Sequence, residues 1–84
     1  MITSLALMSI YKSPTIPLSE ICERYFSLSY DEALRRSARG DLPIPTFRLT
    51  TSQRAPVMVS AEALGAHIDK VEAEATERWK RGQV

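Results

Sequence analysis

The stretch "LPIPTFRLTTSQRAPVMVS", residues 42–60, places two short apolar runs on either side of a polar tip. The runs are residues 46–49 and 57–59, and the tip, residues 50–56, carries hydroxyl groups, an amide and Arg54 but no acid. Apolar runs separated by a few polar residues predict a β-hairpin. Pro56 fits, because a missing N–H is tolerated at a strand start or at a sheet edge. The sequence therefore predicts a hairpin that holds out a basic tip.

A first helix is predicted upstream of this hairpin, from an N-cap at Ser19 to Phe26. Its apolar positions fall at i, i+1, i+4 and i+5, which is one helical face. These positions are Ile21, Cys22, Tyr25 and Phe26. The triplet "SLS", residues 27–29, then breaks the helical pattern.

A second helix is predicted over residues 30–39. Ser29 followed three residues later by Glu32 is a capping-box pattern. Gly40 suits the left-handed position that ends a helix. Steps of four predict an inner face of Tyr30, Leu34 and Ala38. This face places Arg36, Arg39 and Glu32 on the outer side, opposite Leu34, with Arg35 at the flank.

A last helix follows the hairpin, with Ser60 as its cap. Its apolar residues alternate in steps of three and four along Ala61, Leu64, Ile68, Val71 and Ala75, and the helix can reach Trp79. Leu64 and Ile68 suit packing on a core. The later residues lie farther out than a core this small should reach, since a helix rises about 1.5 Å per residue. We therefore expect Val71, Ala75 and Trp79 to support a homodimer or a DNA-bound oligomer.

The N-terminal segment is apolar, and Leu5, Met8 and Tyr11 recur at steps of three, which favours a short helix. Pro14 and Pro17 then predict an extended loop. A chain of 84 residues is one domain, residues 1–84, with a C-terminal helical extension over residues 71–84. The fold class is α+β: a small winged helix-turn-helix with a two-helix unit, a short antiparallel hairpin as the wing and a long C-terminal helix.

The charge pattern agrees with nucleic-acid binding, because the second helix of such a pair enters the DNA major groove. Residues 33–59 hold five arginines and Asp41 as their only acid, a local charge of +4, although the whole chain has only +1. Alone, the helix arginines could equally form a solvated face. The candidate DNA-binding residues are Ser29, Tyr30, Arg35, Arg36, Arg39, Arg48, Thr50, Thr51, Ser52, Gln53 and Arg54.

Other classes of function find little support. The single Cys22 and the lone His67 offer no metal-ligand set, so we expect no metal and no cofactor. No arrangement of a nucleophile with a base and no phosphate-binding glycine loop can be argued, so we do not expect an enzyme. The apolar start is too short to span a membrane. The expected location is therefore the cytoplasm.

The assembled residues resemble the pyocin activator (PrtN-type) family of bacterial regulators. The resemblance rests on "IPLSEICERYF", residues 16–26, on "GDLPIPTFRL", residues 40–49, and on "TSQRAPVMVSAEALGAHID", residues 51–69. Family members often have lysine in place of Arg54, which keeps the charge. The segment that matches least is residues 27–38, the predicted recognition helix, and this implies a different target DNA sequence.

The resemblance implies a transcriptional activator of phage-tail-like bacteriocin genes that binds repeated boxes upstream of them. It also implies an association with the bacterial nucleoid and raises RNA polymerase as a partner. Two related interpretations stay open: a phage excisionase, which acts as a recombination directionality factor, and a small phage repressor. From a different class, the chain could be a protein-interaction module that works through its C-terminal helix and binds no DNA.

Overall fold

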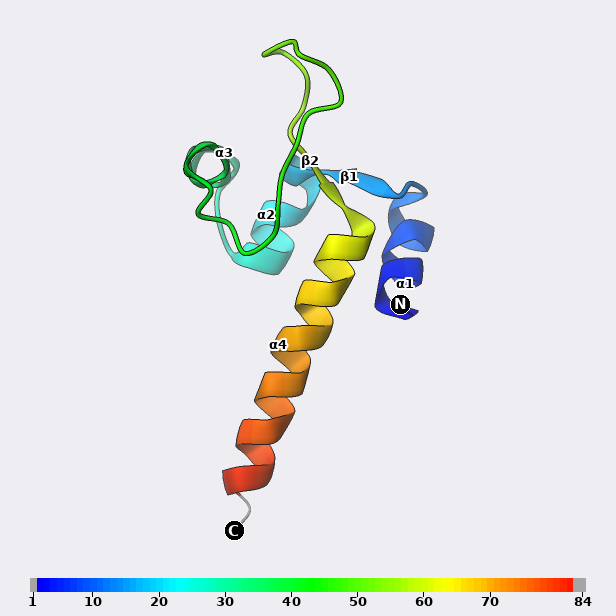
Figure 1. The fold of residues 1–84 in the computed structure, drawn as a ribbon, viewed down its shortest axis with the longest axis vertical. Coiled ribbons are helices and arrows are strands. Elements are labelled where there is room, and N and C mark those ends of the chain that lie inside the picture. Colours follow the sequence, from blue (N-terminus) through cyan, green and yellow to red (C-terminus); the bar gives the residue numbers. More distant parts are fainter. Residues whose placement is uncertain (1, 83–84) are drawn as a thin grey trace.

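A computed structural model describes residues 2–82. Within these residues it has four helices and a two-stranded antiparallel sheet (Figure 1). In chain order the elements are α1 (Ile2–Tyr11), β1 (Thr15–Pro17), α2 (Leu18–Phe26), α3 (Tyr30–Arg39), β2 (Met58–Ser60) and α4 (Ala61–Gly82). The predicted α+β class with a hairpin and a long C-terminal helix is confirmed. The predicted domain covers residues 1–84 and its C-terminal extension residues 71–84, so residues 1, 83 and 84 of these predictions lie outside the described residues.

The sheet corrects one prediction, because β2 takes β1 as its main partner and not the segment 46–49. Ile16 pairs with Val59 at the centre of the sheet, and both side chains are fully buried. Residues 14–17 were predicted as an extended loop. Of these, Thr15–Pro17 are extended, and pairing with Met58–Ser60 makes them a strand. Pro17 is tolerated there because the backbone bond at this end of the sheet is donated by the next residue, Leu18, to the Val57 carbonyl.

The predicted hairpin pairing survives only as one bridge, between Phe47 and Met58, whose backbone groups exchange bonds of 3.0 and 2.7 Å. In an antiparallel ladder the next bonded pairs lie two residues away in each direction. Here these pairs would join Leu49 to Pro56 and Pro45 to Ser60, and each contains a proline without an N–H. The pairing therefore stops after one bridge, and residues 48–56 form an irregular projection that we call the hairpin loop.

The cap predicted at Ser19 is wrong. Helix α2 begins at Leu18 directly after β1, and its N-cap position is Pro17, which makes no side-chain capping bond. The Leu18 N–H donates to the Val57 carbonyl at 2.8 Å. The first residue of α2 therefore also makes the backbone bond that follows the β1–β2 pairing. The predicted inner face of α2 is confirmed, with Ile21 and Cys22 buried and Tyr25 and Phe26 packed against the core.

Both predicted ends of α3 are confirmed. The Ser29 hydroxyl accepts the Glu32 N–H at 3.3 Å, and Gly40 takes a left-handed conformation with φ of +71°. The predicted inner face is confirmed only for Leu34, which is half-buried against the core: Ala33 is the fully buried residue, and Tyr30 and Ala38 are exposed. Because Ala33 rather than Leu34 is fully buried, the helix is turned about its axis by about one residue, or ~100°, from the predicted orientation.

Helix α4 begins as predicted, since the Ser60 hydroxyl accepts the Ala63 N–H at 2.9 Å. Its first turns contribute Ala61, Leu64 and Gly65 to the core, while residues 69–82 are exposed throughout. The predicted helical extension is therefore present, as far as residue 82. Figure 1 shows it running away from the rest of the molecule to the end opposite the hairpin loop.

The predicted N-terminal helix is also present as α1, which packs along the first half of α4. Leu7 is its buried apolar residue, and Leu5, part of the predicted stripe, is exposed. The two helices approach closely at Gly65. A β-carbon built there would lie 2.8 Å from the backbone nitrogen of Ser4. Glycine is therefore required at this position by the closeness of α1.

We predict that Gly65→Ala destabilises the protein, although alanine is normally the better helix former. The added methyl must push back the backbone of α1, and overpacking of this kind costs about 1–3 kcal/mol. That cost exceeds the ~1 kcal/mol by which alanine is favoured over glycine in a helix interior. Urea denaturation measures the change. The control is Gly82→Ala, where no atom lies within 4 Å of the added β-carbon. Equal or higher stability of Gly65→Ala would contradict the packing described.

Candidate nucleic-acid interface

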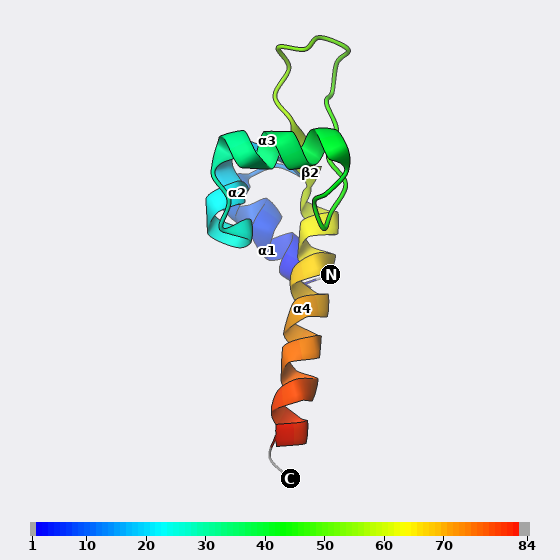
Figure 2. The ribbon, with the colours of Figure 1, turned by 90° about the vertical axis from the view of Figure 1, so that its left-hand side faces the viewer.

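Helix α3 and the hairpin loop lie at the same end of the molecule, as Figures 1 and 2 show from two directions. A shallow groove between them is lined by residues of both, among them Leu34 and Ala38 from α3 and Arg48 and Thr51 from the loop. The structure therefore brings together the two segments that carry the predicted DNA-binding residues.

The base of the hairpin is joined to α3 by two residues that sequence reasoning missed. The hydroxyls of Ser37 and Thr46 share a hydrogen bond of 2.6 Å. They are nine residues apart, on opposite sides of the turn that follows α3. No motif in the sequence signals this pair, because it depends on how that turn folds back.

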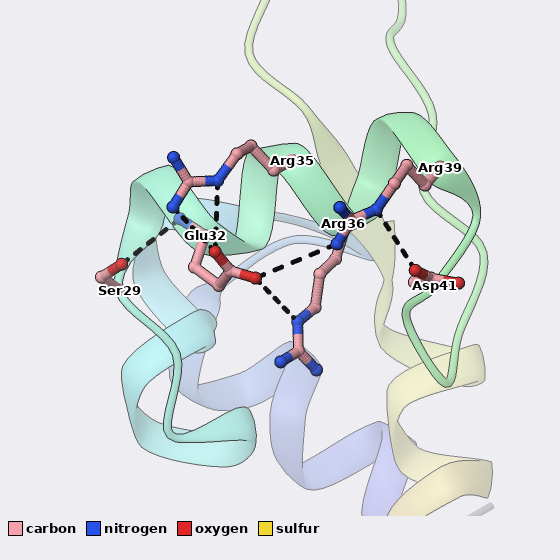
Figure 3. A network of polar contacts seen from close by, with 6 residues as sticks. All are labelled: Ser29, Glu32, Arg35, Arg36, Arg39 and Asp41. Carbon is pink, nitrogen blue, oxygen red and sulfur yellow. Dashed lines mark hydrogen bonds and ion pairs between the residues drawn. The ribbon is translucent and has the colours of Figure 1, made fainter.

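A network of charges covers one side of α3 (Figure 3). The Glu32 carboxylate accepts hydrogen bonds from Nε and Nη2 of Arg35, at 3.2 and 2.7 Å, and from Nε of Arg36 at 3.2 Å. Arg39 lies 4.0 Å from the same carboxylate and forms a closer ion pair, 3.2 Å, with Asp41. All three arginines of α3 are thus paired with acids.

This network lowers the charge that the sequence predicted for the surface. The +4 of residues 33–59 comes from five arginines minus Asp41. Glu32 lies just outside that range, yet its side chain belongs to the same cluster. Counting it gives five minus two, or +3.

The arginines also hold the pKa of Glu32 below its ordinary value, chiefly through the hydrogen bonds from Arg35 and then from Arg36. A carboxyl whose pKa is lowered by folding stabilises the folded state above its unfolded pKa. That contribution is lost as the pH falls through the lowered value. At neutral pH Glu32 is therefore ionised, and the network is intact.

The orientation of α3 changes which arginine points outward. The Arg35 side chain is 66% exposed and that of Arg36 is 43% exposed. In Figure 3, Arg35 lies on the side of α3 from which the hairpin loop rises, and the guanidinium of Arg36 points the other way. Arg36, which was expected to face outward, is thus less exposed than Arg35, because Ala33 rather than Leu34 is the fully buried residue.

The hairpin loop is shaped by its own polar groups. Nε of Arg48 donates to the Ala55 carbonyl at 3.1 Å, which ties the two sides of the loop together. The hydroxyls of Thr50 and Ser52 accept backbone N–H groups at 3.3 and 3.1 Å. Each hydroxyl keeps its own proton for donation. Thr51, Gln53 and Arg54 are exposed at the tip.

The remaining predicted residues are spread over the molecule. Ser29 caps α3 and Tyr30 stands, partly exposed, at its first turn. Val71, Ala75 and Trp79 are exposed on α4. Figure 1 shows the C-terminal end of this helix away from the hairpin loop. His67 packs edge-on against Phe26 with 6.1 Å between ring centroids.

Residues 2–82 contain no group of three His, Cys, Asp or Glu side chains that could hold a metal ion. None of the helices in that range is both long and apolar enough to span a membrane. The observations define a small α+β protein with a helix pair and a basic hairpin at one end.

The chain belongs to the pyocin activator family: the family described as Pyocin activator protein PrtN matches residues 3–75. The resemblance seen in the sequence is thereby confirmed. The family is one of pyocin activators, which supports a regulatory role for the protein in the expression of pyocin genes. No curated protein and no solved structure matches the chain.

Proposed function

We propose that the protein is a transcriptional activator that binds specific double-stranded DNA through α3 and the hairpin loop. The observation that carries this proposal is the joining of the two segments into one basic surface by the Ser37–Thr46 bond. Membership of the pyocin activator family supports pyocin genes as the targets. In this proposal the binding sites are repeated boxes upstream of those genes, and the protein works at the nucleoid in the cytoplasm.

The geometry of the helix pair supports a particular docking. Helix α3 is the second helix of a pair separated by residues 27–29, which is the helix that enters the major groove in helix-turn-helix proteins. Arg35, the most exposed arginine of α3, is then the proposed contact to a guanine edge. The hairpin loop acts as a wing along the neighbouring backbone. There Arg54 and the polar side chains of the tip can bind phosphates.

An excisionase or a small repressor could use the same surface, and the family membership favours the activator. An activator also needs a route to RNA polymerase. The exposed second half of α4, residues 69–82, leaves room for such a contact when α3 lies on DNA.

We predict that Arg54→Ala weakens binding to every duplex and flattens its salt dependence. Removing one phosphate contact lowers the slope of log affinity against log salt by about 0.9 on B-form DNA. Fluorescence anisotropy with one duplex over a series of salt concentrations measures this slope. The matched control is Arg81→Ala, which removes the same charge from the exposed half of α4, off the stripe of Val71, Ala75 and Trp79.

The control should keep the slope of the unchanged protein. An Arg54→Ala slope equal to that of Arg81→Ala would remove the hairpin loop from the contact surface. No salt-dependent retention of any duplex by the unchanged protein would contradict DNA binding itself and would favour the protein-interaction module.

We also propose that α4 supports a homodimer or a DNA-bound oligomer. Val71, Ala75 and Trp79 follow the apolar stripe that begins with Leu64 and Ile68, but they lie beyond the core and are exposed. The Trp79 side chain is 64% exposed. Self-association would suit repeated boxes, because paired copies of a protein bind paired half-sites.

We predict that glutamates at Val71 and Trp79 together abolish self-association and weaken cooperative DNA binding without unfolding the protein. A charge at an apolar contact between copies opposes association, and neither side chain belongs to the core. The control carries the same two added charges at Ala73 and Thr76, off the apolar stripe. Sedimentation velocity and gel-shift stoichiometry give the result. Identical stoichiometry for the control and the Val71/Trp79 variant would contradict an assembly role for α4.

A further inference from the structure

Glu32 is an acidic residue on the surface that we propose faces DNA, where a negative charge is unexpected. A carboxylate close to phosphates is repelled by them and lowers the affinity for any duplex. Yet both oxygens of Glu32 are held at the centre of the arginine network, and its own N–H is fixed by the Ser29 cap (Figure 3). The side chain is thus built into the surface.

The bonds between Glu32 and Arg35 use one particular edge of the guanidinium. Nε and Nη2 of Arg35 both donate to Oε2 of Glu32. This is the side edge of the planar group, so the end edge keeps one N–H of Nη2 and one of Nη1, parallel to each other. Parallel N–H groups of this kind match the O6 and N7 acceptors of guanine in the major groove. Glu32 therefore leaves free the edge that reads a base.

The same bonds act before DNA arrives. Arginine is a flexible side chain, and fixing it on binding costs conformational entropy. Because Glu32 already holds Arg35, much of that loss occurs when the protein folds. A second effect is electrostatic: the carboxylate shares its charge among neighbouring guanidinium groups, which weakens their attraction for phosphates of any sequence. The first effect favours a correct base contact, and the second lowers binding to all duplexes.

We propose that Glu32 is a specificity-determining positioning residue, which orients Arg35 toward a guanine and restrains sequence-independent binding by the arginines of α3. This role rests on the proposed function, in which α3 enters the major groove. Glu32 touches no DNA in this role and acts through the arginines that it holds.

The test compares Glu32→Gln with the unchanged full-length protein. Glutamine keeps one acceptor oxygen in the first turn of α3, but its NH2 group removes the charge and cannot accept the second set of arginine hydrogen bonds. The control is Glu62→Gln, because Glu62 also lies in the first turn of a helix capped by serine and is exposed. The probes are a duplex selected from a random pool by the unchanged protein, its single-base variants, and a scrambled duplex of the same composition.

We expect Glu32→Gln to bind the scrambled duplex more tightly and to discriminate less. The preference for the selected duplex should fall about tenfold, within the range for one bidentate base contact. Most of the loss should fall on one G·C pair. Arg35→Lys should lose discrimination at that same pair, because lysine has no planar fork. Adding Glu32→Gln to Arg35→Lys should then reduce the discrimination at that base pair little further, because both changes act on the same contact.

Three results would overturn this role. Equal effects of Glu32→Gln and Glu62→Gln would mean that only net charge matters. Glu32→Gln could also keep the full preference of the starting protein for the selected duplex over the scrambled one. That result would refute the positioning of Arg35 by Glu32 and would leave the proposed function intact. Failure of the unchanged protein to select any duplex would overturn the proposed function and this role with it. If Glu32→Gln lost its helical circular dichroism, Glu32→Asp would take its place, because aspartate keeps the charge but has a shorter reach to Arg35. An unchanged preference in Glu32→Asp would then overturn the role.

Discussion

The pairing of β2 on both of its edges is the constraint on which the rest of the structure depends. Val59 meets Ile16 on one side, and Met58 bonds to Phe47 on the other. Three segments far apart in the sequence are thereby fixed together: the start of α2, the base of the hairpin loop and the start of α4. Because α2 carries α3, these few backbone bonds set where the proposed recognition helix stands relative to the loop. The Ser37–Thr46 bond then closes the arrangement.

Charge is distributed over this frame in two different ways. The arginines of α3 are paired with Glu32 and Asp41, whereas Arg54 stands at the tip of a loop without acids. A paired arginine is oriented and partly neutralised, which suits reading a base edge. An exposed arginine attracts phosphate at any position along the backbone. Under the proposed function, α3 therefore reads the base sequence, and the hairpin loop attracts the DNA backbone whatever its sequence.

The sequence predicted what depends on neighbouring residues. The bounds of α3, the Ser29 and Ser60 caps and the Gly40 end are set by residues close together in the chain, and all are confirmed. It could not predict that β1 would take the edge of β2, because that choice depends on packing between distant segments. It also missed the buried face of α3. Which residue becomes fully buried, Ala33 rather than Leu34, depends on how α3 packs against the rest of the core, and neighbouring residues in the sequence do not set that packing. Arg35 was consequently placed at the flank.

The central claim is that α3 and the hairpin loop form one DNA-contacting surface. Photo-crosslinking of the full-length protein to a duplex that carries iodouracil, followed by mass spectrometry of the attached peptides, tests it most directly. The account predicts crosslinks both within residues 30–39 and within residues 48–56. Crosslinks confined to α1 or to residues 69–82 of α4, or to only one of the two predicted segments, would contradict it.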